Sequence, residues 1–223
     1  MFNITIDGKA GSGKSTIAKG LSKRLNIKNF NTGAVYRGIA CEYLKQYKDK
    51  KPTDKIIKDF LNTLEIKILF IDNVQNVIVN GTNFTPFLRE EKVSNATPFI
   101  SGYDNLREKV REIQRKFADE NDCIIEGRDI GRVVLKNAQC KFFFTASVTA
   151  RAQRRFKEIK EEDVSLETIK KDIEIRDEMD TDREFGAMLP AKDAIIIDNS
   201  NYSIEQTLDI CQSIVEEKRI LKS

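Results

Sequence analysis

The chain has 223 residues, of which 33% are charged and 40% hydrophobic, with a formal net charge of +3 and no histidine or tryptophan. This length suits one α/β core with an insertion, and the lack of histidine excludes Ser-His-Asp triads and histidine-ligated metal sites. The small net charge gives no support to general nucleic-acid binding, and no apolar stretch approaches the roughly 20 residues that a membrane helix needs.

The first predicted strand, Phe2 to Ile6, leads into a glycine-rich segment with the pattern G-x-x-x-x-G-K-[ST]. This pattern is typical of a phosphate-binding loop, in which backbone N–H groups face a phosphate at the start of a helix. Apolar spacing predicts that helix over Lys14 to Leu25. We expect Lys14 to reach the outer phosphates and Ser15 to bind Mg²⁺. The expected triphosphate-binding residues are Gly8, Lys9, Ala10, Gly11, Ser12, Gly13, Lys14, Ser15 and Thr16.

A short strand near Asn29 and a helix over Gly33 to Tyr47 are predicted next, joined by a turn that contains Thr32. A ligand at the carboxyl edge of a parallel sheet would meet this turn, which offers a hydroxyl, free N–H groups and the guanidinium of Arg37. The alternative is purely structural, with Thr32 as the N-cap and Arg37 solvated. The turn alone does not decide between them.

Residues 60 to 90 interrupt the alternation of single strands and helices, because Glu65 to Phe70 and Asn76 to Val79 have the pattern of paired strands. Asp72-Asn73 and Asn80-Gly81 supply the turns. These strands predict a small antiparallel insert in an α/β chain. The segment from Leu88 to Phe117 then has helical spacing, and its arginines are Arg89, Arg107, Arg111 and Arg115.

The apolar run Cys123 to Glu126 predicts a strand, and Gly127-Arg128-Asp129 follows it directly. Ligands of open α/β sheets bind at the carboxyl ends of the strands. An acid here can hold the water shell of Mg²⁺ or accept from the amine of a base, and Arg128 can bind a phosphate through two nitrogens. The alternative is a surface ion pair at a turn.

Two further strands, Cys140 to Thr145 and Ala194 to Ile197, complete the predicted sheet. Because five continuous apolar strands alternate with helical patterns, we predict an α/β fold with a five-stranded parallel sheet flanked by helices. The helices expected in this part of the chain are Thr149 to Ile159, Leu166 to Met179 and Ser203 to Glu217.

A charged helical excursion over residues 150 to 187 includes Arg176, Asp180 and Arg183, spaced i, i+4 and i+7. In a helix these three residues share one face. The two arginines could contact a phosphoryl group during its transfer, because planar cations stabilise the charge spread over its three oxygens. The ordinary reading of such a charge run is a solvated face. Together with the phosphate-binding loop, this group favours phosphoryl transfer.

The chain resembles bacterial cytidylate kinases, which are P-loop kinases of the nucleoside monophosphate kinase type. The resemblance runs nearly from end to end and rests on motifs in the family's order. Besides the phosphate-binding loop, they are Gly33-Ala34-x-Tyr36-Arg37, Leu88-Arg89 through Leu106-Arg107 to Gln114-Arg115, Gly127-Arg128-Asp129-x-Gly131, and Arg176-Asp177-x-x-Asp180-x-x-Arg183.

The resemblance implies phosphoryl transfer from ATP to CMP or dCMP with Mg²⁺, giving ADP and CDP or dCDP. It also implies a single domain, residues 1–223, in a monomer. The parts expected are a core of about 1–37, 105–149 and 187–223, a nucleoside monophosphate (NMP)-binding insert of about 38–104, and a helical lid of about 150–186.

The resemblance further assigns roles to single residues. Thr32, Arg107 and Asp129 would contact the cytosine, and Arg37 and Arg128 the acceptor phosphate. Arg176 and Asp180 would bind the ribose, and Arg183 the phosphates. Lys14, Arg128, Arg176 and Arg183 would then be the catalytic residues, and Ser15 a ligand of Mg²⁺ with Glu126 acting through water.

Three positions depart from the family's pattern. Asn31 replaces an aspartate, Pro98 replaces a serine that helps to hold the sugar, and Ala187 replaces a proline. Since Pro98 has no hydroxyl, we expect altered sugar contacts and an altered discrimination between CMP and dCMP.

Two rival functions are a P-loop kinase for UMP or another small acceptor, and a nucleotide-dependent switch. Thr32, Arg107 and Asp129 suit an amine-bearing pyrimidine, and the sequence lacks the N-K-x-D motif of guanine-binding switches. We also predict a cytoplasmic protein without a membrane or nucleic-acid partner, because its scattered cysteines suit free thiols and its first residues resemble a core strand rather than an export signal.

Overall fold

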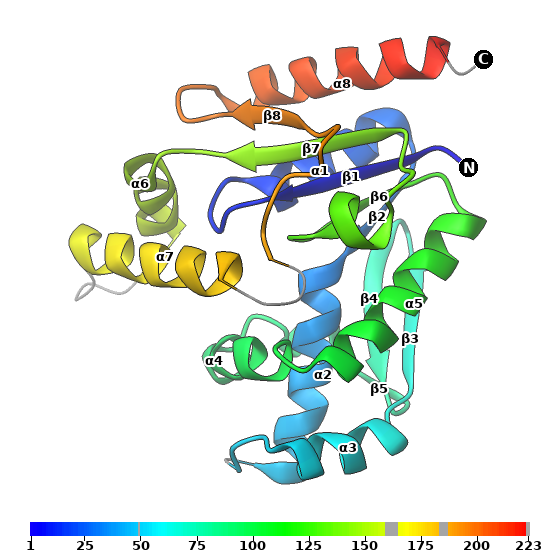
Figure 1. Cartoon of the computed structure of the whole chain (residues 1–223), viewed down its shortest axis with the longest axis vertical. Helices are drawn as coiled ribbons and strands as arrows, with labels where there is room; N and C mark the ends of the chain where they lie inside the picture. The colour runs from blue at the N-terminus through cyan, green and yellow to red at the C-terminus, as the bar shows by residue number, and fades with distance from the viewer. Residues whose placement is uncertain (49, 159–164, 183–186, 222–223) are drawn as a thin grey trace. The chain divides into compact units, whose positions relative to one another are not determined.

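A computed structural model describes residues 1–48, 50–158, 165–182 and 187–221 of the chain. The chain separates into two units, the first made of Met1–Asn29 with Ala118–Ser223 and the second made of Phe30–Phe117. Figure 1 shows the course of the chain, and each unit is considered by itself.

The first unit is built on a five-stranded sheet in the order β2-β6-β1-β7-β8. The central strand β1 pairs in parallel with β6 and with β7, and β7 pairs in parallel with β8. The predicted five-stranded parallel sheet is therefore confirmed (Figure 1). Both faces of its central strands are buried, which explains their continuous apolar sequences. The strands are β1 (Asn3–Gly8), β2 (Lys28–Asn31), β6 (Cys123–Glu126), β7 (Cys140–Thr145) and β8 (Ile195–Asp198).

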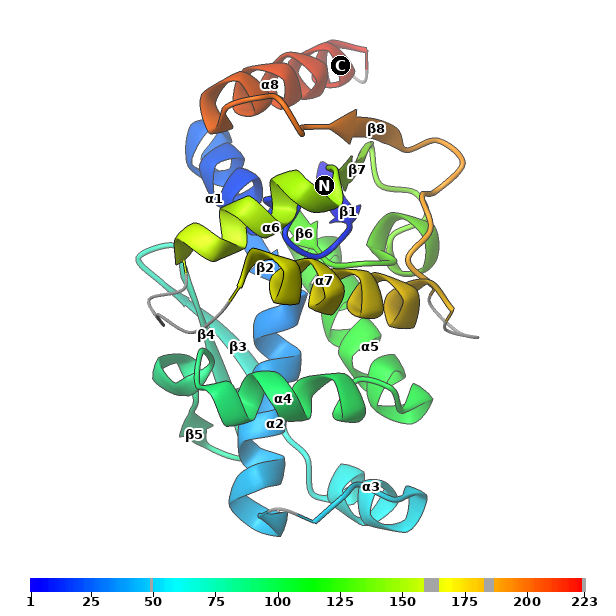
Figure 2. The ribbon, with the colours of Figure 1, turned by 90° about the vertical axis from the view of Figure 1, so that its left-hand side faces the viewer.

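The helices of the first unit pack on this sheet and on each other. Helices α1 and α8 lie together, and the apolar core beneath them includes Ile17 and Leu21 of α1 and Leu208 of α8. Helices α6 and α7 also lie side by side (Figure 2). The bounds are α1 (Lys14–Leu25), α6 (Val148–Glu158), α7 (Leu166–Thr181) and α8 (Ile204–Ile220).

The predicted elements of this unit are all present, with small shifts at their ends. Helix α1 has the predicted bounds, whereas α8 begins at Ile204 because Ser203 is its N-cap and forms a capping box with Gln206. Strand β1 runs two residues beyond the predicted Ile6, and Ile159 lies outside the described residues.

The second unit contains a three-stranded antiparallel sheet in the order β3-β4-β5. Its hairpin turns at Asp72 and Asn73, whose φ angles of 50° and 61° match the left-handed turn that the sequence predicts. The antiparallel insert is confirmed, although Glu65 lies outside its strand and β5 was not expected. The strands are β3 (Ile66–Ile71), β4 (Val74–Val79) and β5 (Thr82–Asn83).

Helices form the rest of the second unit. The helical reading of Leu88 to Phe117 is mostly correct, but α4 begins only at Glu91 and residues 101–103 separate it from α5. Helix α3 was missed; Thr53 caps it, and Tyr43 and Phe60 meet edge to face beneath it. The bounds are α2 (Thr32–Tyr47), α3 (Asp54–Asn62), the 3₁₀ turn Thr85–Phe87, α4 (Glu91–Ile100) and α5 (Asp104–Glu120).

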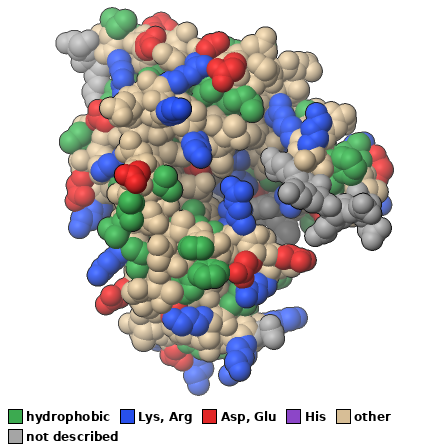
Figure 3. All heavy atoms as spheres, turned by 180° about the vertical axis from the view of Figure 1, so that it is seen from behind, with side chains coloured by type: hydrophobic (Ala, Val, Ile, Leu, Met, Phe, Trp, Pro, Cys, Tyr) green, Lys and Arg blue, Asp and Glu red, His purple; other side chains and the backbone are tan. Residues whose placement is uncertain are grey.

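Acidic and basic side chains are interspersed on the face shown in Figure 3, as the small net charge leads one to expect. Within the described ranges, no helix is long and apolar enough to cross a membrane. All four cysteines are buried free thiols.

Candidate functional site

The glycine-rich loop between β1 and α1 has the backbone that its sequence predicts. Gly8 begins it with a φ of 135°, and a Cβ added there would lie 2.0 Å from the carbonyl oxygen of Phe144. Only glycine allows this close approach to β7. Gly11 and Gly13 also have positive φ angles, and Gly13 is the N-cap of α1. The loop therefore leads its N–H groups into the start of a helix, as an anion site requires.

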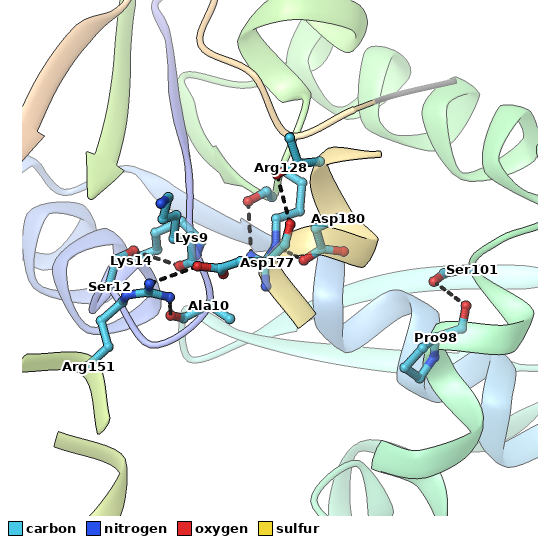
Figure 4. A network of polar contacts seen from close by, with 12 residues as sticks. Lys9, Ala10, Ser12, Lys14, Pro98, Ser101, Arg128, Arg151, Asp177 and Asp180 are labelled. Atoms are coloured by element: carbon cyan, nitrogen blue, oxygen red, sulfur yellow. Dashed lines mark hydrogen bonds and ion pairs between the residues drawn. The ribbon is translucent and has the colours of Figure 1, made fainter. Parts of the chain in front are cut away.

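The side chain of Lys14 lies against this loop rather than in solvent. Its Nζ donates a hydrogen bond to the carbonyl oxygen of Lys9 at 2.6 Å, and the Ser12 hydroxyl donates to the same oxygen at 2.8 Å (Figure 4). Burial, and next the positive charge of Arg128, lower the pKa of the Lys14 ammonium well below its usual value. The negative charge of a bound phosphate would raise this pKa again.

Ser15 and Glu126 meet at the same end of the sheet. The Ser15 hydroxyl donates to Oε2 of Glu126 at 2.5 Å, and burial raises the pKa of that carboxyl. Hydroxyl and carboxylate oxygens of this kind are the ligands that Mg²⁺ prefers. The described residues contain no group of three or more His, Cys, Asp or Glu that can hold a metal. This set fits an ion that takes most of its ligands from phosphates and water.

Arg128 and Asp129 follow β6, and the structure places both at the predicted edge. Arg128 donates through Nε to Oδ2 of Asp180 on α7 at 2.9 Å, with only 24% and 9% of the two side chains exposed. Asp129 is also buried. The alternative of an exposed surface ion pair is therefore wrong here. The Arg176 side chain and all of Arg183 lie outside the described residues.

Asp7 is a buried residue of this site that the sequence interpretation missed. Its two carboxylate oxygens accept the N–H groups of Ile130 and Gly131 at 2.9 and 2.8 Å. These N–H groups belong to one turn of π-helix, Ile130–Val134, directly after Asp129. The signal was an acid that directly follows Ile6 at the end of the predicted strand, just before the glycine-rich loop. Asp7 thus fixes the segment that carries Arg128 and Asp129.

Two more side chains contact the glycine-rich loop from its outer side. Arg151 on α6 donates through Nη1 to the carbonyl oxygen of Ala10 at 3.0 Å, and Asn199 after β8 donates through Nδ2 to that of Ser12 at 2.9 Å. The sequence interpretation placed Arg151 in a charged excursion and did not single out Asn199. The side chain of Arg151 is in fact completely buried.

The second unit contains two of the three residues expected to bind the base, Thr32 and Arg107, whereas Asp129 belongs to the first unit. Gln114 donates through Nε2 to the hydroxyl oxygen of Thr32 at 2.6 Å, and both side chains are buried. Arg107, also buried, donates through Nη1 to the carbonyl oxygen of Ser101 at 3.4 Å. Buried polar side chains that hold one another in this way are suited to recognising a polar ligand.

Asn31 rather than Thr32 is the N-cap of α2, so the structural role proposed for Thr32 is wrong. The Asn31 side chain accepts from the N–H of Ala34 at 2.8 Å. Asparagine caps a helix as well as aspartate does, so the replacement of the family's aspartate by Asn31 leaves the start of α2 intact. Arg37 lies half-buried on α2.

The model of the cytidylate kinase family matches residues 4–219 of the chain. A protein from Clostridium botulinum (strain Loch Maree / Type A3), named cytidylate kinase, is 38% identical over 218 residues, which cover 96% of this chain and 98% of that protein. One of the same name from Halalkalibacterium halodurans is 37% identical, with coverages of 97% and 98%. A third, from Caldicellulosiruptor bescii, is 39% identical, with coverages of 93% and 92%.

Among solved structures, one of an uncharacterized protein from Eubacterium ventriosum matches 97% of this chain and 99% of its own, with a TM-score of 0.53. At 15% sequence identity, this likeness concerns the fold alone.

Proposed function

The chain belongs to the cytidylate kinase family, and on that premise we propose that it transfers the γ-phosphoryl group of ATP to CMP or dCMP, giving ADP and CDP or dCDP. The observation that carries the proposal is the first unit's cluster of Lys14, Ser15 with Glu126, and Arg128 with Asp180. This cluster places a phosphate-binding loop and a partly buried arginine at the same edge of one sheet.

The donor residues act through position and charge. The N–H groups of the loop hold the ATP phosphates, and Lys14 neutralises charge on the outer ones. The Nζ atom of Lys14 is already close to the loop, on the carbonyl oxygen of Lys9. No residue forms a covalent intermediate, because phosphoryl transfer needs alignment and charge stabilisation rather than an enzyme nucleophile.

Mg²⁺ fits the donor residues described above. Ser15 would hold it directly, and Glu126 would hold one of its water ligands. When bound, Mg²⁺ neutralises the donor phosphates. The hydrogen bond between Ser15 and Glu126 keeps both oxygens in place without the ion.

The acceptor residues are proposed by analogy with the family and are supported by burial. Thr32 and Arg107 in the second unit and Asp129 in the first would contact the cytosine. For the phosphate we propose Arg37 and Arg128.

The ribose is assigned to Asp180 and Arg176, and Arg183 would contact the phosphates. Arg128 holds Asp180 through Oδ2, and in this assignment the Asp180 carboxylate accepts a hydrogen bond from a sugar hydroxyl.

A coupled assay of ADP release tests the function directly, with ATP, Mg²⁺ and one nucleoside monophosphate at a time. We expect CMP and dCMP to stimulate ADP release, UMP to do so weakly, and AMP and GMP to have no effect. A preference for UMP would instead support the rival P-loop kinase. A Lys14→Met variant should lose activity with every acceptor, which excludes a contaminating kinase.

We also propose a cytoplasmic monomer. The four buried free thiols support a reducing compartment. Size-exclusion chromatography with light scattering would test the monomer.

A further inference from the structure

The outer side of the phosphate-binding loop poses a chemical problem. A loop that turns its N–H groups toward a phosphate turns carbonyl groups away from it. Ala10 and Ser12 are buried, with 4% and 0% of their surface exposed. Their carbonyl oxygens cannot rely on water, and a buried carbonyl without a donor is costly.

Two side chains from distant parts of the chain supply these donors. The guanidinium of Arg151 reaches the carbonyl oxygen of Ala10, and the amide of Asn199 reaches that of Ser12. They lie 141 and 187 residues away from their acceptors in sequence. Both contacts are short and buried, and both fall within the first unit.

Each donor is itself held by a second contact. Arg151 also donates through Nε to the carbonyl oxygen of Ala146 at 3.0 Å and pairs with Oδ2 of Asp177 at 2.7 Å (Figure 4). Arg154, one turn further along α6, donates to Oδ1 of Asn199 at 3.0 Å and to its backbone oxygen at 2.6 Å. Neither donor can turn away from the loop without losing these bonds.

Arg151 also fills the space behind the loop. A Cβ added at Gly11 would lie 3.3 Å from the Cβ of Arg151. The two residues are therefore already in close contact through their backbones and stems. A substitution that keeps Cβ and Cγ, such as methionine, therefore removes the hydrogen bonds of Arg151 and leaves the atoms behind Gly11 in place.

We propose that Arg151 and Asn199 are positioning residues for the phosphate donor. By holding the carbonyls of Ala10 and Ser12 outward, they keep the N–H groups of the loop directed at the triphosphate before ATP arrives. Asp177 and Arg154 keep the two donors in place. A preformed loop avoids the cost of ordering on binding. The proposal rests on the proposed function only in taking ATP as the donor.

Two variants test the donors separately. Arg151→Met keeps much of the volume of the side chain and removes its hydrogen bonds. Asn199→Asp keeps Oδ1 for Arg154 but loses the Nδ2 donor and puts an anion beside the carbonyl of Ser12. Lys157→Met is the matched control, because it removes an equal charge from an exposed position on the same helix.

The measurement is calorimetric titration of each full-length variant with ATP and Mg²⁺ in the absence of an acceptor, followed by KM values for ATP and CMP. We expect Arg151→Met and Asn199→Asp to weaken ATP binding about tenfold or more, as the loss of a buried charged or polar donor predicts. The KM for CMP should change by less than about twofold, and Lys157→Met should match the wild type.

Unchanged ATP binding in Asn199→Asp overturns the proposal, and so does an equal rise in both KM values, which would indicate a general structural defect. If Arg151→Met does not fold, Asn199→Asp still decides the matter. Because ATP binding is measured without an acceptor, a protein that binds ATP but does not phosphorylate CMP would refute the proposed function and leave this test intact.

Discussion

Nε of Arg128 donates to Oδ2 of Asp180 at 2.9 Å in an ion pair that is largely shielded from solvent. Asp177, one turn earlier on α7, pairs with Arg151 at 2.7 Å. One face of α7 therefore fixes two arginines, one behind the phosphate-binding loop and one on the segment after β6. The direction in which Arg128 points is set by α7 as much as by its own backbone.

The variant Asp180→Asn should lower kcat/KM for CMP by about tenfold, because Arg128 loses a charge-assisted partner and the proposed contact of Asp180 with the ribose is weakened. ATP binding should be nearly unchanged. Steady-state kinetics with each nucleotide varied in turn provides the measurement. Asp209→Asn is the control, since it breaks the exposed pair with Arg24 and should leave both constants as they are. A loss confined to ATP would contradict the assignment of Arg128 to the acceptor.

Asp7 should make stability depend on pH in an unusual direction. Burial raises the pKa of its carboxyl from 3.8 to about 6, against the lowering effect of the N–H groups of Gly131 and Ile130. Between these two values the folded protein keeps a proton that the unfolded chain has released. The free energy of unfolding contributed by Asp7 therefore falls as pH rises through this window, by about 2–3 kcal/mol in all.

Urea unfolding of the wild type and of Asp7→Asn at several pH values between about 4 and 6 would isolate this effect. We expect the stability of the wild type relative to the variant to decrease with rising pH. A difference that stays constant, or that increases, would mean that the Asp7 carboxyl is already ionised at low pH in the folded state.

Thr5→Val should stabilise the protein. The Thr5 hydroxyl is buried in β1 and has no hydrogen-bond partner among the residues described. A methyl group of the same shape removes this desolvation cost, and we expect a gain of about 1 kcal/mol in the free energy of unfolding. Thr207→Val is a matched comparison, because that buried hydroxyl donates to the carbonyl oxygen of Ser203 at 2.8 Å and its loss should destabilise. Urea midpoints would measure both, and a Thr5→Val protein no more stable than the wild type would refute the idea.

Pro98→Ser should change the choice between CMP and dCMP. Pro98 lies inside α4, and its carbonyl oxygen accepts from the Ser101 hydroxyl at 3.2 Å (Figure 4). The substitution adds a hydroxyl at a position where the family uses one for the sugar. We expect the ratio of kcat/KM for CMP over dCMP to rise by about threefold to tenfold. Ser94→Ala, on the exposed surface of the same helix, should leave the ratio unchanged. The same ratio in Pro98→Ser and the wild type would remove position 98 from sugar recognition.

The parts of the fold that are encoded locally could be predicted from the sequence. The glycine-rich loop and α1 follow from glycine spacing and helical periodicity within one short segment, and both agree with the structure. Helix α3 was missed although Ile57, Phe60 and Leu61 have helical spacing, because at nine residues it is too short for the pattern to distinguish a helix from another apolar segment.

The supports of the site could not be predicted in the same way. The bonds from Ile130 and Gly131 to Asp7 join residues 123 and 124 positions apart. Similarly, Arg151 stands in a charged run, and its burial depends on a loop carbonyl and on Asp177, neither of which a local pattern can bring together. Motifs thus indicated the groups that face a ligand, whereas the groups behind them depend on tertiary contacts.

The central position of β1 also constrains the order in which the chain can fold during synthesis. Asn3 pairs with Cys123, and Ile4 pairs with Cys140, so both neighbours of this strand are translated more than a hundred residues after it. A ribosome that adds about 5–20 residues per second leaves β1 without partners for about 6–25 seconds. The continuous segment Phe30–Phe117 emerges within that interval and contains its own core. The second unit is therefore the first part of the nascent protein able to fold, and β1 stays without its sheet partners until that unit has been synthesised.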